Sequence, residues 1–382
     1  MQQNRTVGID ASNIRAGGGL KHLRETLNAA TDPREFGIER IHVYGGTQLA
    51  QLIDRPWLVK RQLPAFERGF LSQYWWKSRS YPGLLRAENQ LVYVPGGLYP
   101  GAGVDYVCTA QNMLVFERRE RNRFPLGPTR LRYSVLNRIQ RRAFRHSIGN
   151  IFITEHSRAL IQQQVPASKD RPYAIVPYGA TADFFAPPKP QRPIDSYSFE
   201  APLRALYVSV VNFYKHQWHL VDAVGRLRER GYPIHLTLIG PPGPGGADAR
   251  LQAALARHPE AATYLGPVPY AALAQQYKDA DLYLFGSSCE TMPNVLVEAM
   301  SAGLPIVSSH LGPMREILGE GGGYADPTDP VAFAEETARL LDDPALRSRL
   351  ARRAHDNAAR YTWEKSAEGI YGFLGQTLTT RP

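Results

Sequence analysis

The sequence predicts an α/β protein with two doubly wound domains, each built on a parallel sheet. Its 382 residues are enough for about two domains. In both halves short apolar runs alternate with amphipathic stretches, which is the pattern of βαβ units. A polar stretch with four prolines at 185–198 lies between the halves and predicts an interdomain linker.

The first half is predicted to form one domain over residues 1–180. Glycine, proline and asparagine bound its apolar runs, which predict strands at 6–10, 41–44, 91–94, 104–109 and 148–153. Three glycines at 17–19 follow the first strand and precede a helix-like stretch at 20–29.

The second half has a more regular pattern and is predicted to form a domain over residues 199–362. Strands are expected at 203–211, 234–239, 264–265, 281–285 and 305–308. Helices are expected at 219–230, 248–257, 270–278 and 295–302. In open α/β sheets ligands bind beyond the carboxyl ends of the strands, so two such domains suggest two ligands that meet in a cleft.

The composition excludes several classes of protein. Cys108 and Cys289 are too few for a disulfide framework or for a cysteine-based zinc site. The N-terminus lacks the features of a signal peptide, and no apolar run approaches the ~20 residues of a spanning helix. We therefore expect a cytoplasmic protein.

Positive charge is concentrated in one segment of the chain. The net charge is +10, and residues 111–146 hold ten arginines against two glutamates. Such a patch favours an anionic partner, which is nucleic acid, anionic lipid or a phosphorylated substrate. The alternative is a solvated, arginine-rich face.

The segment 281–307 gives the strongest indication of chemistry. An apolar strand ends in a polar loop that contains Glu290, and a helix begins near Pro293 and Asn294 with Glu298 in its second turn. The backbone N–H groups at such a helix start can bind an anion, and the carboxylates suit the hydroxyls of a sugar. The alternative is a carboxylate that stabilises the helix N-terminus, together with a solvated glutamate.

This segment resembles the signature of family 4 retaining glycosyltransferases of the GT-B fold, because Glu290, Glu298 and a following Ala-Met-x-x-Gly-x-Pro have the family's spacing. The likeness extends to bacterial polysaccharide mannosyl- and hexosyltransferases. It implies two Rossmann-like domains that face each other across a cleft, with a helix at 363–382 that crosses back to the N-terminal domain. Further matching segments lie at 17–19, 176–180, 207–215, 264–268, 280–285 and 312–317.

The resemblance also implies roles for individual residues. Glu298 is expected to hold the ribose of a nucleotide, Glu290 the hydroxyls of the transferred sugar, and Lys215 the pyrophosphate. Glu290, Lys215 and Gln111 are the expected catalytic residues. Further donor contacts are expected from Gly18, Gly19, Val268, Thr291, Met292, Pro293, Asn294 and Arg315.

Two positions depart from the family's pattern. Val210 stands five residues before Lys215, where the family usually has an arginine. Candidate substitutes for this arginine are Asn212, His216 and Arg315. Gln111 stands where the family often has a histidine, and an amide does not titrate, which excludes a histidine acid or base at that point.

The resemblance implies a hexosyltransferase that acts with retention of configuration. The first choice of donor is GDP-mannose, and the acceptor is a hydroxyl of a lipid-linked or polysaccharide intermediate. The nucleotide sugar is a substrate, and neither a metal, a cofactor nor a nucleic acid partner is expected. The alternatives are a GT-B sugar-nucleotide epimerase and a non-enzymatic, nucleic-acid-binding α/β protein.

Aromatic and basic residues alternate at 66–79. Tyr74, Trp75 and Trp76 lie there beside lysine and arginine, a composition that suits the interface of a bilayer. Packing against the domain core is the alternative.

A predicted helix at 129–146 also bears on membranes. Its apolar residues recur every four positions, at Leu131, Val135, Ile139 and Ala143. With the surrounding arginines, this spacing fits a core-facing helix with a basic outer face. Together with 66–79, it leads us to expect peripheral attachment of the N-terminal domain to the inner face of a membrane.

Overall fold

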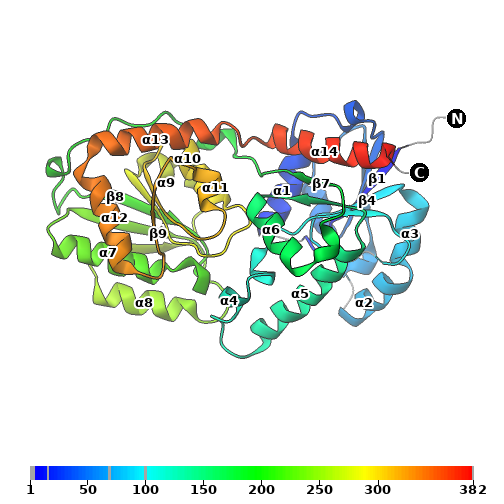
Figure 1. Cartoon of the computed structure of the whole chain (residues 1–382), viewed down its shortest axis with the longest axis horizontal. Coiled ribbons are helices and arrows are strands. Elements are labelled where there is room, and N and C mark those ends of the chain that lie inside the picture. The colour runs from blue at the N-terminus through cyan, green and yellow to red at the C-terminus, as the bar shows by residue number, and fades with distance from the viewer. Residues whose placement is uncertain (1–4, 15–16, 68–69, 99–100, 381–382) are drawn as a thin grey trace. The chain divides into compact units, whose positions relative to one another are not determined.

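The computed structural model of the chain describes residues 5–14, 17–67, 70–98 and 101–380, without the side chains of 70–74. The chain forms two compact units (Figure 1). The N-terminal unit comprises Met1–Phe116, Ser134–Gly179 and Trp363–Pro382, and the C-terminal unit comprises Glu117–Tyr133 and Ala180–Thr362. Each unit is a parallel sheet with helices, so the predicted fold class is confirmed.

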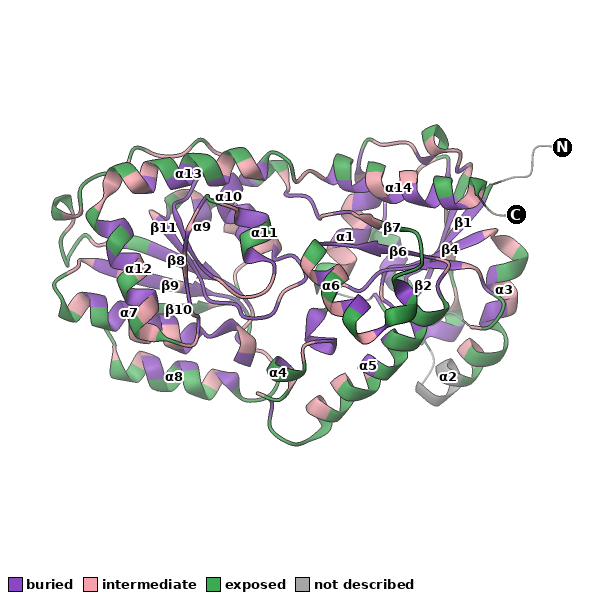
Figure 2. Cartoon of the chain, in the orientation of Figure 1, coloured by how far each residue is buried: buried purple, intermediate pink, exposed green. Residues whose placement is uncertain are grey.

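The N-terminal unit has a seven-stranded parallel sheet in the order β3-β2-β1-β4-β5-β6-β7. Its strands are β1 (Thr6–Asp10), β2 (Arg40–Gly45), β3 (Leu58–Gln62), β4 (Leu91–Val94), β5 (Tyr106–Cys108), β6 (Gly149–Phe152) and β7 (Tyr173–Ile175). The central strands are buried on both faces (Figure 2), which is why most of their residues are apolar. The prediction missed β3 and β7. Both are edge strands and only partly buried, so they lack such a run.

In the part of the chain that the structure describes, six helices belong wholly or mostly to this unit. They are α1 (Gly17–Asn28), α2 (Phe70–Arg79), α3 (Tyr81–Glu88), α5 (Pro128–His146), α6 (Glu155–Gln164) and α14 (Trp363–Thr379). Helix α14, red in Figure 1, packs on α1 and β7, and Tyr371 donates its hydroxyl to the Thr26 carbonyl at 3.3 Å. The predicted return of the last helix to the N-terminal domain is therefore confirmed.

The C-terminal unit has a six-stranded parallel sheet in the order β10-β9-β8-β11-β12-β13. Its strands are β8 (Leu203–Val208), β9 (Ile234–Ile239), β10 (Ala262–Gly266), β11 (Leu282–Phe285), β12 (Ile306–Ser309) and β13 (Gly323–Ala325). The strand order reverses between β8 and β11, and such a switch point is where open α/β sheets bind ligands.

The helices of the C-terminal unit connect its strands or follow them, except α4, which lies between β5 and β6 in the chain. They are α4 (Arg118–Arg121), α7 (Gln217–Glu229), α8 (Ala247–Arg257), α9 (Tyr270–Asp279), α10 (Asn294–Ser301), α11 (Met314–Leu318), α12 (Pro330–Asp342) and α13 (Pro344–Ala358). Among the described residues, no helix is both long and apolar enough to cross a bilayer.

The proline-rich stretch at 185–198 is fixed along the C-terminal unit. The buried Arg347 guanidinium donates to the carbonyl of Arg192 and, at 3.2 Å, to Gln191 Oε1. Lys189 Nζ donates to the Ala280 carbonyl at 2.8 Å. These polar contacts explain how a polar stretch without an apolar pattern is held in place.

Candidate functional site

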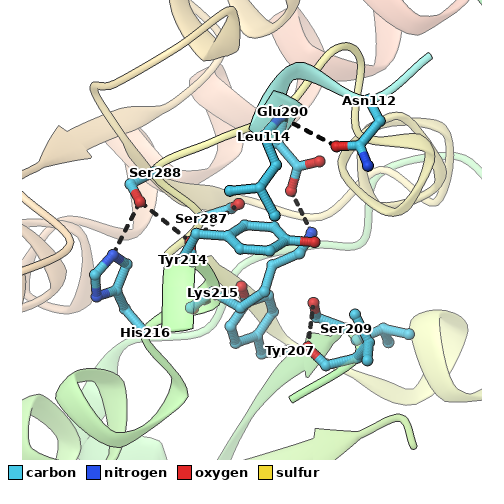
Figure 3. Close-up of polar contacts among 12 residues, drawn as sticks. Asn112, Leu114, Tyr207, Ser209, Tyr214, Lys215, His216, Ser287, Ser288 and Glu290 are labelled. Atoms are coloured by element: carbon cyan, nitrogen blue, oxygen red, sulfur yellow. Dashed lines mark hydrogen bonds and ion pairs between the residues drawn. The ribbon is translucent and has the colours of Figure 1, made fainter. Parts of the chain in front are cut away.

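Lys215 and Glu290 meet at the switch point of the C-terminal sheet. Lys215 ends a short 3₁₀ helix, Phe213–Lys215, that follows β8, and Glu290 lies in the loop after the neighbouring strand β11. Their side chains form an ion pair between Nζ and Oε1 (Figure 3). Both side chains are nearly buried, 9% exposed for Lys215 and 14% for Glu290. The structure therefore brings together the two residues for which the sequence predicted phosphate and sugar contacts.

The backbone around Lys215 is fixed by its neighbours. The Tyr207 hydroxyl donates to the Lys215 carbonyl at 2.8 Å. The ammonium lies 5.2 Å from the ring centroid of Tyr214 and 5.9 Å from that of Phe285, within the range of cation–π attraction. His216 then adopts the left-handed conformation with φ 52°, which is uncommon outside glycine. This turn starts α7 directly behind the lysine.

Hydrogen bonds join the loop after β8 to the loop after β11. The Ser288 N–H donates to the Tyr214 carbonyl at 2.8 Å, and the Ser287 hydroxyl donates to the same carbonyl at 3.3 Å. His216 Nε2 lies 3.0 Å from Ser288 Oγ (Figure 3). Burial lowers the pKa of His216 to about 3, so its imidazole is neutral at ordinary pH. The two loops therefore act as one unit.

Glu298 lies in α10 and is 2% exposed. Its carboxylate accepts hydrogen bonds from Tyr277, at 3.2 Å on Oε2, and from Tyr270, at 3.4 Å on Oε1. The sequence analysis missed these tyrosines as site residues. Their separation of seven residues, two helical turns, places both on one face of α9 and is the signal that could have found them.

Helix α10 begins close to the predicted position. Pro293 is the N-cap of the helix and Asn294 is its first residue. The Leu296 N–H donates to the Pro293 carbonyl at 3.0 Å, so it is not available to an anion. Asn294 Oδ1 is buried with no hydrogen-bond partner among the residues that the structure describes. It is therefore an acceptor that a bound ligand could satisfy. Thr291 and Met292 are buried beside it.

The N-terminal unit brings Gln111 and Gly19 together. Gln111 Nε2 lies 3.0 Å from Nδ1 of His22, a residue that the sequence analysis missed. Burial lowers the pKa of His22 to about 4, so the imidazole is neutral and Nδ1 accepts the amide proton. A Cβ on Gly19 would lie 2.9 Å from Gln111 Oε1, whereas a Cβ on Gly18 would meet nothing within 4 Å. Gly19 therefore allows the close approach of Gln111.

Arg315 and Val268 are not part of these clusters. The Arg315 guanidinium lies 4.2 Å from the centroid of the Tyr324 ring and lines a hollow with His310 and Asp326. Val268 is half-buried in the loop between β10 and α9. Their predicted donor contacts stay predictions.

The three candidate substitutes for an arginine at Val210 are engaged elsewhere. Asn212 Oδ1 accepts from the Phe213 N–H at 2.8 Å, His216 bonds Ser288, and Arg315 lies over Tyr324. These contacts account for the position of each side chain, and no cationic role beside Lys215 is needed to explain it.

Helix α5 does not turn its regular apolar stripe to the core. Leu131 is 66% exposed, Val135 43% and Ile139 37%, while Ala143 is buried. The residues that α5 buries are Asn137, Gln140, Ala143 and Phe144. The interpretation of the stripe as core-facing was therefore wrong for its first three residues. Asn137 instead donates to the Val115 carbonyl at 3.0 Å, a polar contact that an apolar pattern does not predict.

The aromatic segment in α2 divides into two parts. Trp75 is 55% exposed, with the Arg79 guanidinium 4.6 Å from its ring centroid. Trp76 packs edge-to-face on Phe66 at 5.4 Å, which supports the core-packing alternative for this residue. The side chain of Tyr74 lies outside the described residues.

The described residues were also compared with the requirements of a metal site and of a reactive thiol. Within the described ranges, no group of three or more His, Cys, Asp and Glu side chains could hold a metal ion. Burial raises the pKa of both the Cys108 and Cys289 thiols, which opposes thiolate chemistry.

Comparison with known proteins places this geometry in context. Residues 193–357 match the family described as glycosyl transferases group 1. A D-inositol 3-phosphate glycosyltransferase from Corynebacterium urealyticum is 32% identical over 173 residues, which are 43% of this chain and 40% of that relative. The chain thus matches less than half the length of this relative.

Solved structures match over nearly the whole chain. Sucrose-phosphate synthase from Thermosynechococcus elongatus superposes with a TM-score of 0.72 at 17% identity, over 99% of this chain and 100% of that one. Anabaena Alr3699/HepE in complex with UDP and glucose gives a TM-score of 0.68 at 17% identity, over 99% and 100%. These likenesses show the fold.

Proposed function

We propose that the chain is a glycosyltransferase that moves a hexose from a nucleoside diphosphate donor to a hydroxyl acceptor, with retention of configuration. The observation that carries the proposal is the Lys215–Glu290 ion pair at the switch between β8 and β11. The match of residues 193–357 to group 1 glycosyl transferases supports it, because this range contains both residues and Glu298.

The chemistry of these groups suits such a reaction. As the sugar–phosphate bond breaks, negative charge grows on the departing diphosphate, and the Lys215 ammonium would stabilise it. The Glu290 carboxylate would accept hydrogen bonds from sugar hydroxyls, and Glu298 from the ribose. A bound donor would therefore exchange the Lys215–Glu290 ion pair for contacts of each partner with a different part of the ligand.

Retention needs either a covalent intermediate or attack on the face that the diphosphate leaves. We propose the second route, in which the departing phosphate takes the acceptor proton. The Glu290 carboxylate, which pairs with Lys215, would then bind the sugar rather than attack it as a nucleophile. The anomeric configuration of the product, measured by NMR, tests retention, and an inverted product would overturn it. Trapping of a sugar on the protein, detected by mass spectrometry, would favour the covalent route instead.

GDP-mannose is the donor that we propose to test first. Thermal shift and calorimetry with GDP, UDP and dTDP, followed by their sugars, identify the nucleotide because a ligand of the folded state raises the melting temperature. Saturable binding of one diphosphate and sugar transfer from its nucleotide sugar are expected. If none of the three diphosphates binds, the proposed function is wrong.

The acceptor needs a separate test. The curated relative is named for D-inositol 3-phosphate, so this phosphorylated polyol and a lipid-linked phosphate sugar are the acceptors that we propose to compare. Transfer to either supports the proposal. Consumption of the nucleotide sugar without any acceptor, with formation of an epimer, would favour a sugar-nucleotide epimerase instead.

We also propose that α5 attaches the protein to an anionic bilayer. The stripe of Leu131, Val135 and Ile139 is exposed, and arginines on the same helix are exposed too, at 132, 138, 141, 142 and 145. An apolar stripe with basic flanks suits the headgroup zone, and each arginine near an anionic surface contributes about 1 kcal/mol.

Sedimentation with vesicles tests the attachment. We expect binding to phosphatidylglycerol vesicles that falls with added salt and with the double change Leu131→Ser and Val135→Ser. Val331→Ser, at a valine that is 48% exposed in α12, is the matched control and should bind like the wild type. Equal partitioning to neutral and anionic vesicles, or none, would leave the arginines as a solvated face.

A further inference from the structure

A short segment between β5 and β6 belongs to the C-terminal unit, although the chain on both sides of it belongs to the N-terminal unit. Within this segment, 117–133, Phe124 is buried and packs edge-to-face on Phe213 at 5.3 Å between ring centroids. A Cβ on Gly245 would lie 3.1 Å from the same Phe124 ring, so that glycine allows the contact. The segment is thus anchored on the 3₁₀ turn that ends at Lys215.

Glu120 in α4 is the buried acid of this segment. It is 3% exposed, and its Oε2 accepts from Arg123 Nε at 2.7 Å and from the Ser288 hydroxyl at 2.7 Å. A buried carboxylate costs stability unless it is paired and hydrogen-bonded, and here it has both kinds of partner. Ser288 lies 168 residues further along the chain and two residues before Glu290.

The direction of these hydrogen bonds follows from the chemistry of the groups. A carboxylate and a carbonyl can only accept, and the Ser288 hydroxyl lies 2.7 Å from the Glu120 carboxylate but 3.3 Å from the Tyr214 carbonyl, so its one proton points to the closer, charged acceptor Glu120. The serine oxygen is then left to accept from Nε2–H of the neutral His216, 3.0 Å away. The carboxylate thereby selects the Nε2–H tautomer of His216, and Nδ1 has no partner within the described ranges. The chain of bonds links Glu120 to the residue beside Lys215.

We propose that Glu120 is a positioning residue for the Lys215–Glu290 pair. Through Ser288 and His216 it fixes the loops that carry both partners, so the donor site is completed by a segment that comes from the N-terminal half of the sequence. The inference rests on the proposed function, because its readout is binding of the donor's nucleoside diphosphate. It adds a structural dependence of the donor site on a segment outside residues 193–357.

Two substitutions at Glu120 separate its functions. Glu120→Gln keeps an acceptor for Ser288 and loses the charge, whereas Glu120→Ala removes this acceptor and leaves the Ser288 hydroxyl only the Tyr214 carbonyl, at 3.3 Å. Glu336→Gln is the matched control, since Glu336 also pairs with an arginine three residues later, Arg339, at 2.6 Å in the same unit.

Calorimetry with GDP, UDP and dTDP on each folded variant gives the decisive measurement. Glu120→Ala should lower the affinity for the diphosphate that the wild type binds. We expect a loss of about tenfold, the equivalent of one or two hydrogen bonds. Glu120→Gln should recover most of this loss, and Glu336→Gln should bind like the wild type. Ser288→Ala should weaken binding similarly, and the double variant with Glu120→Ala should be no worse than either single change, because both break one chain.

Each outcome decides the proposal. A purely structural role would lower the melting temperature of Glu120→Ala and leave the affinity of the folded protein unchanged, which would overturn the inference. If Glu120→Ala does not fold, Ser288→Ala decides in its place, and wild-type affinity for this variant would overturn the inference. A wild type that binds none of the three diphosphates overturns the proposed function itself, whereas tight wild-type binding that these variants do not weaken overturns only the role of Glu120.

Discussion

Two charged side chains meet beyond the strand ends of the C-terminal unit, whereas the predicted site residue Gln111 of the N-terminal unit is a neutral amide that a neutral imidazole holds. Lys215 and Glu290 are paired and nearly buried in the first, and Gln111 is bonded to His22 in the second. A charged diphosphate needs fixed charges that are present before it arrives. Hydroxyl groups need donors and acceptors in a fixed orientation. The difference therefore fits a donor held by the C-terminal unit and a sugar or acceptor hydroxyl held by the N-terminal unit.

Removing the cation should have the largest effect. Lys215→Ala is expected to lower turnover by about 10²–10³-fold, because Lys215 meets charge that grows in the transition state. Arg257→Ala, which breaks the more exposed ion pair with Asp222 at 2.7 Å, is the control and should leave turnover unchanged. Steady-state kinetics measures both. A turnover within a few-fold of the wild type would mean that the C-terminal unit does not act through this charge.

Loss of the buried carboxylate should follow in size. Glu298→Ala is expected to weaken binding of the nucleoside diphosphate by about 1.5–3 kcal/mol, the value of hydrogen bonds to a charged group. Tyr277→Phe, which removes the hydroxyl that donates to Glu298, should cost less. Calorimetry gives the comparison, with Glu335→Ala, an exposed glutamate of α12, as the control. Unchanged affinity in Glu298→Ala would remove Glu298 from the site.

Acid should destabilise both units through their buried histidines. His22 has a pKa lowered to about 4 and His216 one lowered to about 3, against 6.5 when exposed. The unfolded chain therefore binds protons that the folded chain does not, and stability falls as the pH drops below 6.5. At pH 5 each histidine should cost up to about 2 kcal/mol. Urea unfolding at pH 7, 6 and 5 measures the slope. His22→Gln should flatten it, and parallel curves for this variant and the wild type would contradict the prediction.

The smallest effect is expected at the glycines of α1. Gly19→Ala places a methyl group 2.9 Å from Gln111 Oε1 and should displace the amide, while the flexible glutamine end keeps the cost in stability low. Gly83→Ala, at a glycine of α3 where an added Cβ would also meet nothing within 4 Å, is the matched control. We expect Gly19→Ala to lose activity a few-fold and the control to keep it, while both variants melt at similar temperatures. This combination would show that the substitution displaces Gln111 and does not impair folding. Equal activities would show that the position of Gln111 is not critical.

The central strands and the loop that carries Glu290 could be predicted because their signals are local. Strands β4 and β11 are continuous apolar runs, and Glu290 and Glu298 lie in one segment around a single strand–helix junction. The edge strand β3 is missed because its exposed side needs no apolar residues.

Other features depend on contacts between distant parts of the chain. The bond between Glu120 and Ser288 spans 168 residues, and nothing in either local sequence indicates it. The stripe of α5 was misread for another reason. Apolar residues recur every four positions whether that face of the helix packs on a core or lies in solvent. The exposure of Leu131 and Val135 therefore depends on the packing of the whole unit.

The return of α14 to the N-terminal unit has a consequence for synthesis on the ribosome. Ile370, Tyr371 and Leu374 belong to the same core cluster as Val7 and Ile9 of β1. When residues 180–362 have emerged from the ribosome, the whole sequence of the C-terminal unit is available for folding. The core of the N-terminal unit still lacks the apolar side chains of α14. In a nascent chain the N-terminal domain usually folds first. Here the N-terminal unit can complete its fold only after the C-terminal unit has been synthesised. A ribosome that stalls before Trp363 would leave an apolar sheet surface open to chaperones and to aggregation.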